Sequence, residues 1–295
     1  MIVMRKRMSD RFIDAVLIVL LILLAVLFIY PIWFVVIASI SEPASIASGR
    51  VLLLPKNITF SGYEKLLEYK SLWRGYANSL FYLFFGSFLS LAATLPTAYA
   101  LSRKELKGRK FLNALFIVSM YFGGGLIPTY LLHSTIGWIN TIWVLLIPSS
   151  LNVYHMILAR SSFESMPESL YESVCLDGGT HFRYFIQFAI PLCKATIAVL
   201  FLFSALTWWN EYIRFVIYIE NPDLQSLQVI IRQITSELTA SLSDSASTGA
   251  AIEVQRQMEL MKYSVVVIAA IPFAILYPFI QKYFNKGVMI GAVKG

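Results

Sequence analysis

The polar segment Ser165–Leu192 is the first place in this sequence where residue types and spacing suggest a specific task. Its opening residues, Ser165-Met166-Pro167-Glu168, match a capping box, in which the serine oxygen and the glutamate carboxylate satisfy free N–H groups at a helix start. Gly178-Gly179 predict the end of that helix, because glycine adopts the left-handed conformation without a Cβ clash. Thr180 is placed to cap a second helix. We therefore predict a compact helix–turn–helix unit at 165–192.

The surface of this predicted unit allows two interpretations. Leu170 and Val174 share one helical face, whereas Glu168, Glu172 and Asp177 are spread around the rest of the helix. Such a unit can be a lid that packs on its own protein, or a rigid element that contacts another protein. The pattern alone favours neither interpretation.

A second group of candidate residues lies inside apolar runs of the sequence. Polar groups at membrane depth are costly unless they are paired, so their presence there points to function. Aromatic rings beside hydrogen-bonding side chains suit the binding of a sugar, which offers hydroxyls and a flat face. The alternatives are an aromatic belt at the membrane surface and polar contacts between helices. The candidate pathway residues are Asn152, Tyr154, Trp209, Asn210 and Glu211.

The composition identifies the class of protein that must position these residues. Of the 295 residues, 58% are apolar and 14% are charged, whereas a soluble domain carries about a quarter charged residues. We therefore predict an all-α polytopic membrane protein that contacts membrane lipid. The net charge of +7 comes from clusters beside apolar runs, where basic residues set membrane orientation. It does not indicate binding to nucleic acid.

Six apolar runs approach or exceed the length that a membrane-spanning helix needs. Basic clusters at 5–11 and 103–110 place the N-terminus and the C-terminus in the cytoplasm. The unit at 165–192 then lies in the cytoplasm, between the fourth and fifth spans, and we treat 1–295 as one domain. The predicted spans cover residues 12–40, 75–100, 111–132, 141–163, 194–219 and 263–283.

Several kinds of catalytic chemistry are missing from the sequence. It has no glycine-rich phosphate loop ending in Gly-Lys-Ser/Thr, so we expect no ATP hydrolysis by this chain alone. It has no metalloprotease histidine pair and no Gly-x-Ser-x-Gly elbow. His133, His155 and His181 are scattered, and Cys175 and Cys193 lack metal or redox spacing. We therefore expect no catalytic residue, metal or cofactor in this chain.

The segment 165–192 resembles the EAA loop of ABC importer permeases. That pattern is Glu-Ala-Ala, three residues, Gly, and a later hydrophobic-Leu-Pro motif. The chain keeps the spacing from Glu172 to Gly178 but has Ser173 and the bulkier Val174 in place of the alanines, and it continues to Ile190-Pro191-Leu192. Asn78-Ser79, Trp209–Tyr212 and 286–295 are similar to maltose-type carbohydrate permeases. YFGGGLIPTYLL and YPFIQKYFNKGVMIGAVKG resemble the complex-oligosaccharide branch, including alginate-type importers.

The resemblance implies a permease subunit that carries a sugar or oligosaccharide across the bacterial cytoplasmic membrane. It implies four kinds of partner: a second related permease, two ATP-binding subunits that hold ATP and Mg, an extracytoplasmic solute-binding protein, and the substrate. It also implies that the tail residues Lys294 and Gly295 extend towards the ATPase. The residues expected to couple transport to the ATPase are Glu168, Glu172, Ser173, Asp177, Gly178 and Gly179.

Three other functions remain open from the sequence. The same architecture could import an amino acid or a peptide, and the permease could pair with itself or with a relative. A polytopic membrane enzyme would need a convergent acid–base or metal set. A scaffold or sensor would need neither a polar pathway nor a docking unit.

Overall fold

The computed structural model describes residues 8–244, 258, 260–275 and 278, and every regular element in these residues is helical. The all-α prediction is therefore confirmed. The chain divides into two compact units, Met1–Tyr69 with Ile234–Ile271, and Lys70–Gln233 with Pro272–Gly295. We refer to them as unit 1 and unit 2.

Unit 1 is built around the long helix α1 (Met8–Ser39), followed by α2 (Pro43–Ala47) and α3 (Ser61–Glu68). The end of α1 is held by a 2.7 Å hydrogen bond between the Ser39 and Tyr63 hydroxyls. It is also held by Ser264, whose hydroxyl donates to the Ser39 carbonyl at 3.4 Å. Most side chains between Ile13 and Ile32 are exposed apolar groups, as a helix in contact with lipid requires.

Unit 2 begins with an unbroken helical stretch and continues through shorter helices. The stretch consists of α4 (Lys70–Phe81), the π-helical turn η1 (Tyr82–Gly86) and α5 (Ser87–Ser102). The following helices are α6 (Arg109–Tyr121), α7 (Leu126–Thr135), α8 (Trp143–Leu146), α9 (Val153–Glu164), α10 (Glu168–Leu176), α11 (His181–Tyr184), η2 (Phe185–Ala189), α12 (Ile190–Leu192), α13 (Lys194–Trp209), α14 (Ile213–Tyr218), η3 (Pro222–Leu224) and α15 (Leu227–Asp244), of which unit 2 contains the part up to Gln233.

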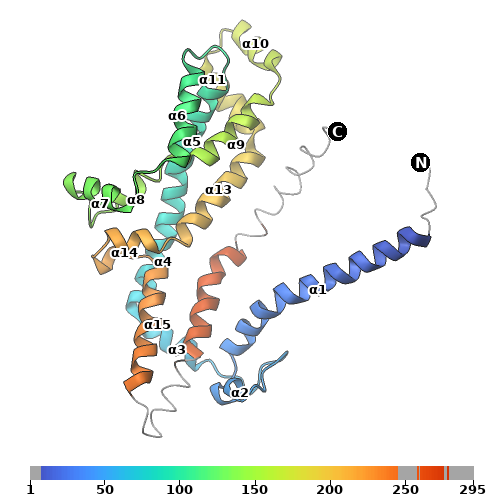
Figure 1. The fold of residues 1–295 in the computed structure, drawn as a ribbon, viewed down its shortest axis with the longest axis vertical. Coiled ribbons are helices and arrows are strands. Elements are labelled where there is room, and N and C mark those ends of the chain that lie inside the picture. Colours follow the sequence, from blue (N-terminus) through green and yellow to red (C-terminus); the bar gives the residue numbers. More distant parts are fainter. Residues whose placement is uncertain (1–7, 245–257, 259, 276–277, 279–295) are drawn as a thin grey trace. The chain divides into compact units, whose positions relative to one another are not determined.

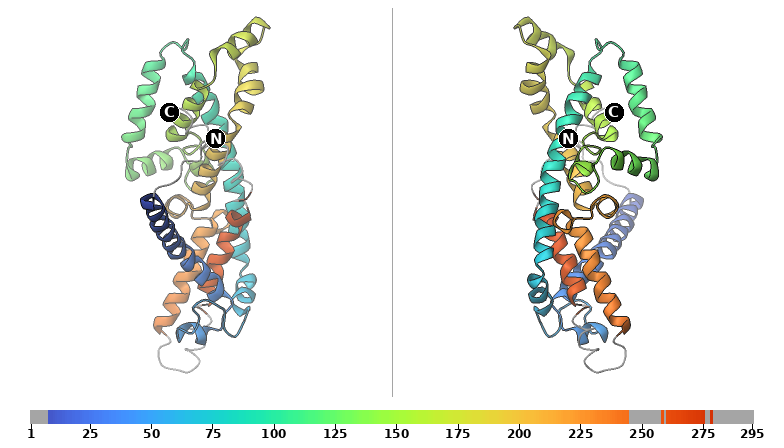
Figure 2. Two further views of the ribbon diagram at one scale, coloured as in Figure 1. Left: turned by 90° about the vertical axis from the view of Figure 1, so that its right-hand side faces the viewer. Right: turned by 90° about the vertical axis from the view of Figure 1, so that its left-hand side faces the viewer.

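The core of unit 2 lies where α5, α9 and α13 pack side by side (Figure 1). Ala98, Phe163, Tyr184 and Leu200 are fully buried in this core. Helices α10 and α11 lie beyond it, and α10 stands at the tip of unit 2 in both views of Figure 2. The core helices therefore carry the tip at one end. At their other end lie the N-terminus of α9 and the C-terminus of α13.

Several predicted spans are interrupted in the structure. The stretch 111–132 consists of α6 and α7, which are bent by 108° around the glycines at 123–125. The stretch 141–163 is divided between α8 and α9 by Pro148 and a short turn, and 194–219 breaks after Trp209. In the described part of the chain, two helices are long and apolar enough to cross a membrane, or four if each bent pair is one span. The last predicted span, 263–283, is described up to Ile275 as the helix Leu260–Ile275, and most of its later residues lie outside the described part of the chain.

Candidate functional site

The tip of unit 2 is a helix, a tight turn and a second helix, as the sequence predicts. Gly178 has a φ of +73°, and its N–H donates to the Cys175 carbonyl at 3.0 Å. The Gly179 N–H donates to the Val174 carbonyl at 2.8 Å, which closes the end of α10. The Thr180 hydroxyl accepts a 3.3 Å hydrogen bond from the Arg183 N–H and caps α11. The predicted roles of the glycine turn and of Thr180 are confirmed.

The predicted capping box at 165–168 is wrong. Ser165 ends α9, and its hydroxyl donates to the Ser162 carbonyl at 2.8 Å instead of capping the next helix. The N-cap of α10 is Pro167, which has no side-chain oxygen to accept a hydrogen bond. The Glu168 carboxylate accepts a 2.9 Å bond from Lys104 Nζ, and this partner holds the pKa of Glu168 below its usual range. Ser165 has helical backbone angles, with a φ of −77° and a ψ of −8°, whereas an N-cap residue has extended backbone.

The outer surface of the tip combines apolar and acidic side chains. Leu176, at the end of α10, is 89% exposed, and Phe182, on α11, is 74% exposed. Glu172 and Asp177 are also exposed, whereas Val174 is buried against the core. The tip therefore packs on its own chain through one face and presents a leucine and a phenylalanine outwards, which is more typical of a docking element than of a lid.

The base of the tip is held by one arginine among three tyrosines. Arg103, just after α5, places its guanidinium carbon 4.9 Å from the ring centroid of Tyr99, 5.7 Å from that of Tyr171 and 5.8 Å from that of Tyr184. Those rings belong to α5, α10 and α11, so a single cation contacts all three helices. This contact joins α10 and α11 of the tip to the core helix α5.

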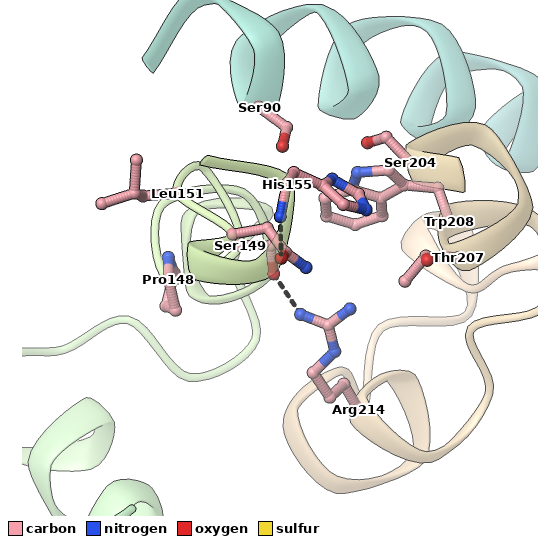
Figure 3. A pocket seen from close by; sticks show the side chains of 10 residues that line it. Ser90, Pro148, Ser149, Leu151, His155, Ser204, Thr207, Trp208 and Arg214 are labelled. Carbon is pink, nitrogen blue, oxygen red and sulfur yellow. Dashed lines mark hydrogen bonds between the residues drawn. The ribbon is translucent and has the colours of Figure 1, made fainter. Parts of the chain in front are cut away.

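A cavity of about 210 Å³ lies at the other end of the core helices (Figure 3). Its walls come from α5, the α8–α9 turn, α9, α13 and α14. Most of its lining side chains are short and polar or aromatic. The lining residues are Ser90, Pro148, Ser149, Leu151, Asn152, His155, Ser204, Thr207, Trp208 and Arg214.

Arg214 is fixed in this cavity by three neighbours. Its guanidinium pairs with the Glu211 carboxylate and donates to the Ser149 hydroxyl. Its guanidinium carbon also lies 5.4 Å from the ring centroid of Trp208. The Arg214 N–H donates to Glu211 Oε1 at 3.2 Å, so α14 begins at this ion pair. An arginine held in this way keeps its position and still has N–H donors for a ligand.

The structure brings only part of the predicted pathway set together. Asn152 lines the cavity, where its side chain accepts a 3.0 Å hydrogen bond from the His155 N–H, and Glu211 holds Arg214. Tyr154 is exposed beside His155, outside the lining. Trp209 is 3% exposed and packs edge-on against Tyr76 at 5.6 Å. Asn210 donates back to the Leu206 carbonyl at 2.9 Å. The structure therefore places three of the predicted residues outside the cavity lining: Tyr154, Trp209 and Asn210.

The predicted pathway set did not include the other lining residues, although their spacing contains a signal. Ser204, Thr207 and Trp208 lie at positions i, i+3 and i+4 of α13 and so share one face. Arg214 follows Glu211 by three residues, which allows their ion pair. His155, expected to be a tolerated polar side chain, also lines the cavity. The tail residues Lys294 and Gly295 lie outside the described residues. Among the residues that the structure describes, no group of side chains could hold a metal ion.

Comparison with known proteins places this arrangement in a family. No family model matches the sequence. LplC of Bacillus subtilis is 34% identical over 269 residues, which cover 90% of each chain. The polygalacturonan/rhamnogalacturonan transport system permease protein YtcP of the same organism is 31% identical, over 98% of this chain and 100% of that protein. A crystal structure of a bacterial ABC transporter involved in the import of the acidic polysaccharide alginate matches 95% of this chain and 99% of the compared chain, with a TM-score of 0.84 and 33% identity.

The chain belongs to the permease subunits of carbohydrate ABC importers. Permeases of this family are integral membrane proteins, which agrees with the apolar helices of the structure. They are transport proteins rather than enzymes, so the membrane-enzyme alternative is not supported. The predicted resemblance to the alginate-type branch of carbohydrate permeases is confirmed.

Proposed function

We propose that this chain forms the translocation pathway for an oligosaccharide and couples it to ATP hydrolysis by separate subunits. The observation that carries the proposal is the projecting tip of unit 2, which exposes Leu176 and Phe182 beside the Gly178 turn. Apolar side chains on a small projecting element are suited to fill a cleft in a partner. The partner proposed here is an ATP-binding subunit.

The contacts at the base of the tip support a role in transmitting motion. A movement of α10 and α11 that is driven by ATP binding reaches α5 through Arg103 and its three tyrosines. In this proposal Glu172 and Asp177 contact the partner, while Gly178 and Gly179 form the turn. Ser173 donates to the Leu170 carbonyl and Glu168 pairs with Lys104, so these two residues act by bracing α10.

The family supports the rest of the assembly. We propose two ATP-binding subunits that hold ATP and Mg, a second permease subunit, and a solute-binding protein outside the bacterial cytoplasmic membrane. We also propose six spans with both termini in the cytoplasm, in which bent and interrupted helices such as α6–α7 each contribute to one span. The relatives that are named for alginate and for polygalacturonan support an acidic oligosaccharide as the substrate, rather than an amino acid or a peptide.

Chemical labelling of the native cysteines tests the docking and the orientation together. Cys175 is exposed on α10 and Cys193 is buried, so a membrane-impermeant maleimide should label only Cys175, and only from the cytoplasmic face. Assembly with the ATP-binding subunits should reduce this labelling several-fold, because the thiol lies beside Leu176. The Cys175→Ser variant gives the background level of maleimide labelling. Labelling from the outer face would contradict the topology, and equal labelling with and without the ATP-binding subunits would contradict the docking.

A further inference from the structure

The cavity of unit 2 has a composition that selects among carbohydrate ligands. Arg214 is the one charged residue in its described lining, where no aspartate or glutamate occurs. Short polar side chains from α5 and α13, among them Ser90, Ser204 and Thr207, also form the wall (Figure 3). Hydroxyls and amides bind sugar hydroxyls, whereas a guanidinium is suited to a carboxylate, which it can bind through two parallel hydrogen bonds.

Arg214 is arranged so that N–H donors of its guanidinium remain available to a ligand. Glu211 pairs with it but does not line the cavity, so the carboxylate fixes the guanidinium from outside the cavity. Its bonds to Glu211 and Ser149 occupy two of the five N–H donors of an arginine. The buried ring of Trp208 lies against the same guanidinium and limits its movement. A fixed arginine with free donors is preorganised for an anionic group.

A second observation concerns the histidine in the cavity wall. His155 lines the cavity and is buried, and its Nδ1 has no hydrogen-bond partner among the described residues. Leaving a buried polar atom unpaired is costly, and native proteins do so rarely. His155 is therefore a polar side chain of the cavity wall whose buried Nδ1 is unpaired among the described residues.

We propose that this cavity is a subsite for one uronate ring of the oligosaccharide, with its carboxylate at Arg214. The volume of about 210 Å³ is smaller than a typical pocket for a drug-sized ligand, which fits one ring rather than a chain of several. This inference rests on the proposed transport function and deepens it. The permease itself then distinguishes acidic from neutral sugars, in addition to any selection by the binding protein.

The test compares ATP-dependent uptake of galacturonate and alginate oligosaccharides with uptake of their methyl esters, in which an uncharged ester replaces each carboxylate. The full complex is used in membrane vesicles. The variants are Arg214→Gln and the double variant Glu211→Gln/Arg214→Gln, which leaves no unpaired carboxylate. Arg232→Gln is the control, because Arg232 contacts the Tyr212 ring but does not line the cavity.

The double variant should lower uptake of the acid about tenfold or more, since a hydrogen bond to a charged group is lost, and should change uptake of the ester much less. Arg232→Gln should leave the ratio of acid to ester uptake unchanged. The uronate subsite would be overturned if the double variant assembles, transports the ester and keeps the wild-type ratio of acid to ester uptake. The proposed transport function would not be affected by that result. The subsite is also overturned if the wild-type complex prefers the esters. If the wild-type complex takes up neither sugar, the proposed function itself fails, and the subsite fails with it.

Discussion

Replacing Gly178 by aspartate is expected to abolish sugar uptake while the protein remains folded in the membrane. Gly178 has a φ of +73°, which aspartate reaches at modest cost, and a Cβ at this position would meet no atom within 4 Å. The added carboxylate lies beside Asp177 on the surface proposed to enter the partner's cleft. An uncompensated charge buried there costs about 3 kcal/mol or more, which is roughly a hundredfold in affinity.

The matched control for this substitution is Gly178→Asn. Asparagine has nearly the same size as aspartate and also tolerates the left-handed conformation, but it carries no charge. The measurements are uptake and the amount of ATP-binding subunit that co-purifies with each variant. We expect the asparagine variant to keep most of both quantities. Normal uptake by the aspartate variant would refute the docking role of the turn, and an equal loss in both variants would assign the effect to size rather than to charge.

Replacing Gly86 by alanine should impair transport through the cavity rather than through the tip. A Cβ on Gly86 would lie 2.5 Å from Nε1 and 2.7 Å from Cζ2 of Trp208, so the indole must move. Trp208 is 2% exposed, stacks on Tyr82 and contacts Arg214, and it lines the cavity. Overpacking of this kind costs about 1–3 kcal/mol. We expect uptake to fall about tenfold or more and the thermal stability of the complex to decrease.

Two further variants test whether the effect of Gly86→Ala comes from the contact of the new methyl group with Trp208. Gly123→Ala adds the same methyl group where no atom lies within 4 Å of the new Cβ, and it should have little effect on stability. Adding Trp208→Phe to Gly86→Ala should restore part of the stability, because the smaller ring leaves room for the methyl group. If Gly86→Ala alone behaves like wild type, the packing of Trp208 does not control the cavity.

The tip of unit 2 could be predicted from local sequence, because turns and caps depend on residues close together in the chain. Gly178 has the left-handed φ that the absence of a Cβ allows, and Thr180 has the extended backbone of an N-cap. Ser165 shows the limit of this reasoning. Its hydroxyl could serve the helix before it or the helix after it, and its helical backbone angles select the former.

The cavity could be predicted only in part, since its composition depends on helix rotation and on contacts distant in sequence. Trp208 and Trp209 are adjacent, but successive residues of an α-helix point about 100° apart, so one lines the cavity and the other packs against Tyr76. The contact between Arg214 and Ser149 joins residues 65 positions apart. The π-helical turn η1 also changes the helical register just before Gly86 meets Trp208, and a regular 3.6-residue period does not reveal this.

The most direct test of the account is the ATPase activity of the complex purified through this subunit. The activity is measured with and without a solute-binding protein loaded with an acidic oligosaccharide. We predict that ATP-binding subunits co-purify with the chain and that the loaded binding protein stimulates hydrolysis several-fold, whereas the empty binding protein stimulates it less. A folded, membrane-extracted chain that retains no ATP-binding subunit, or a complex whose hydrolysis does not respond to any loaded binding protein, would contradict the coupling of this permease to ATP.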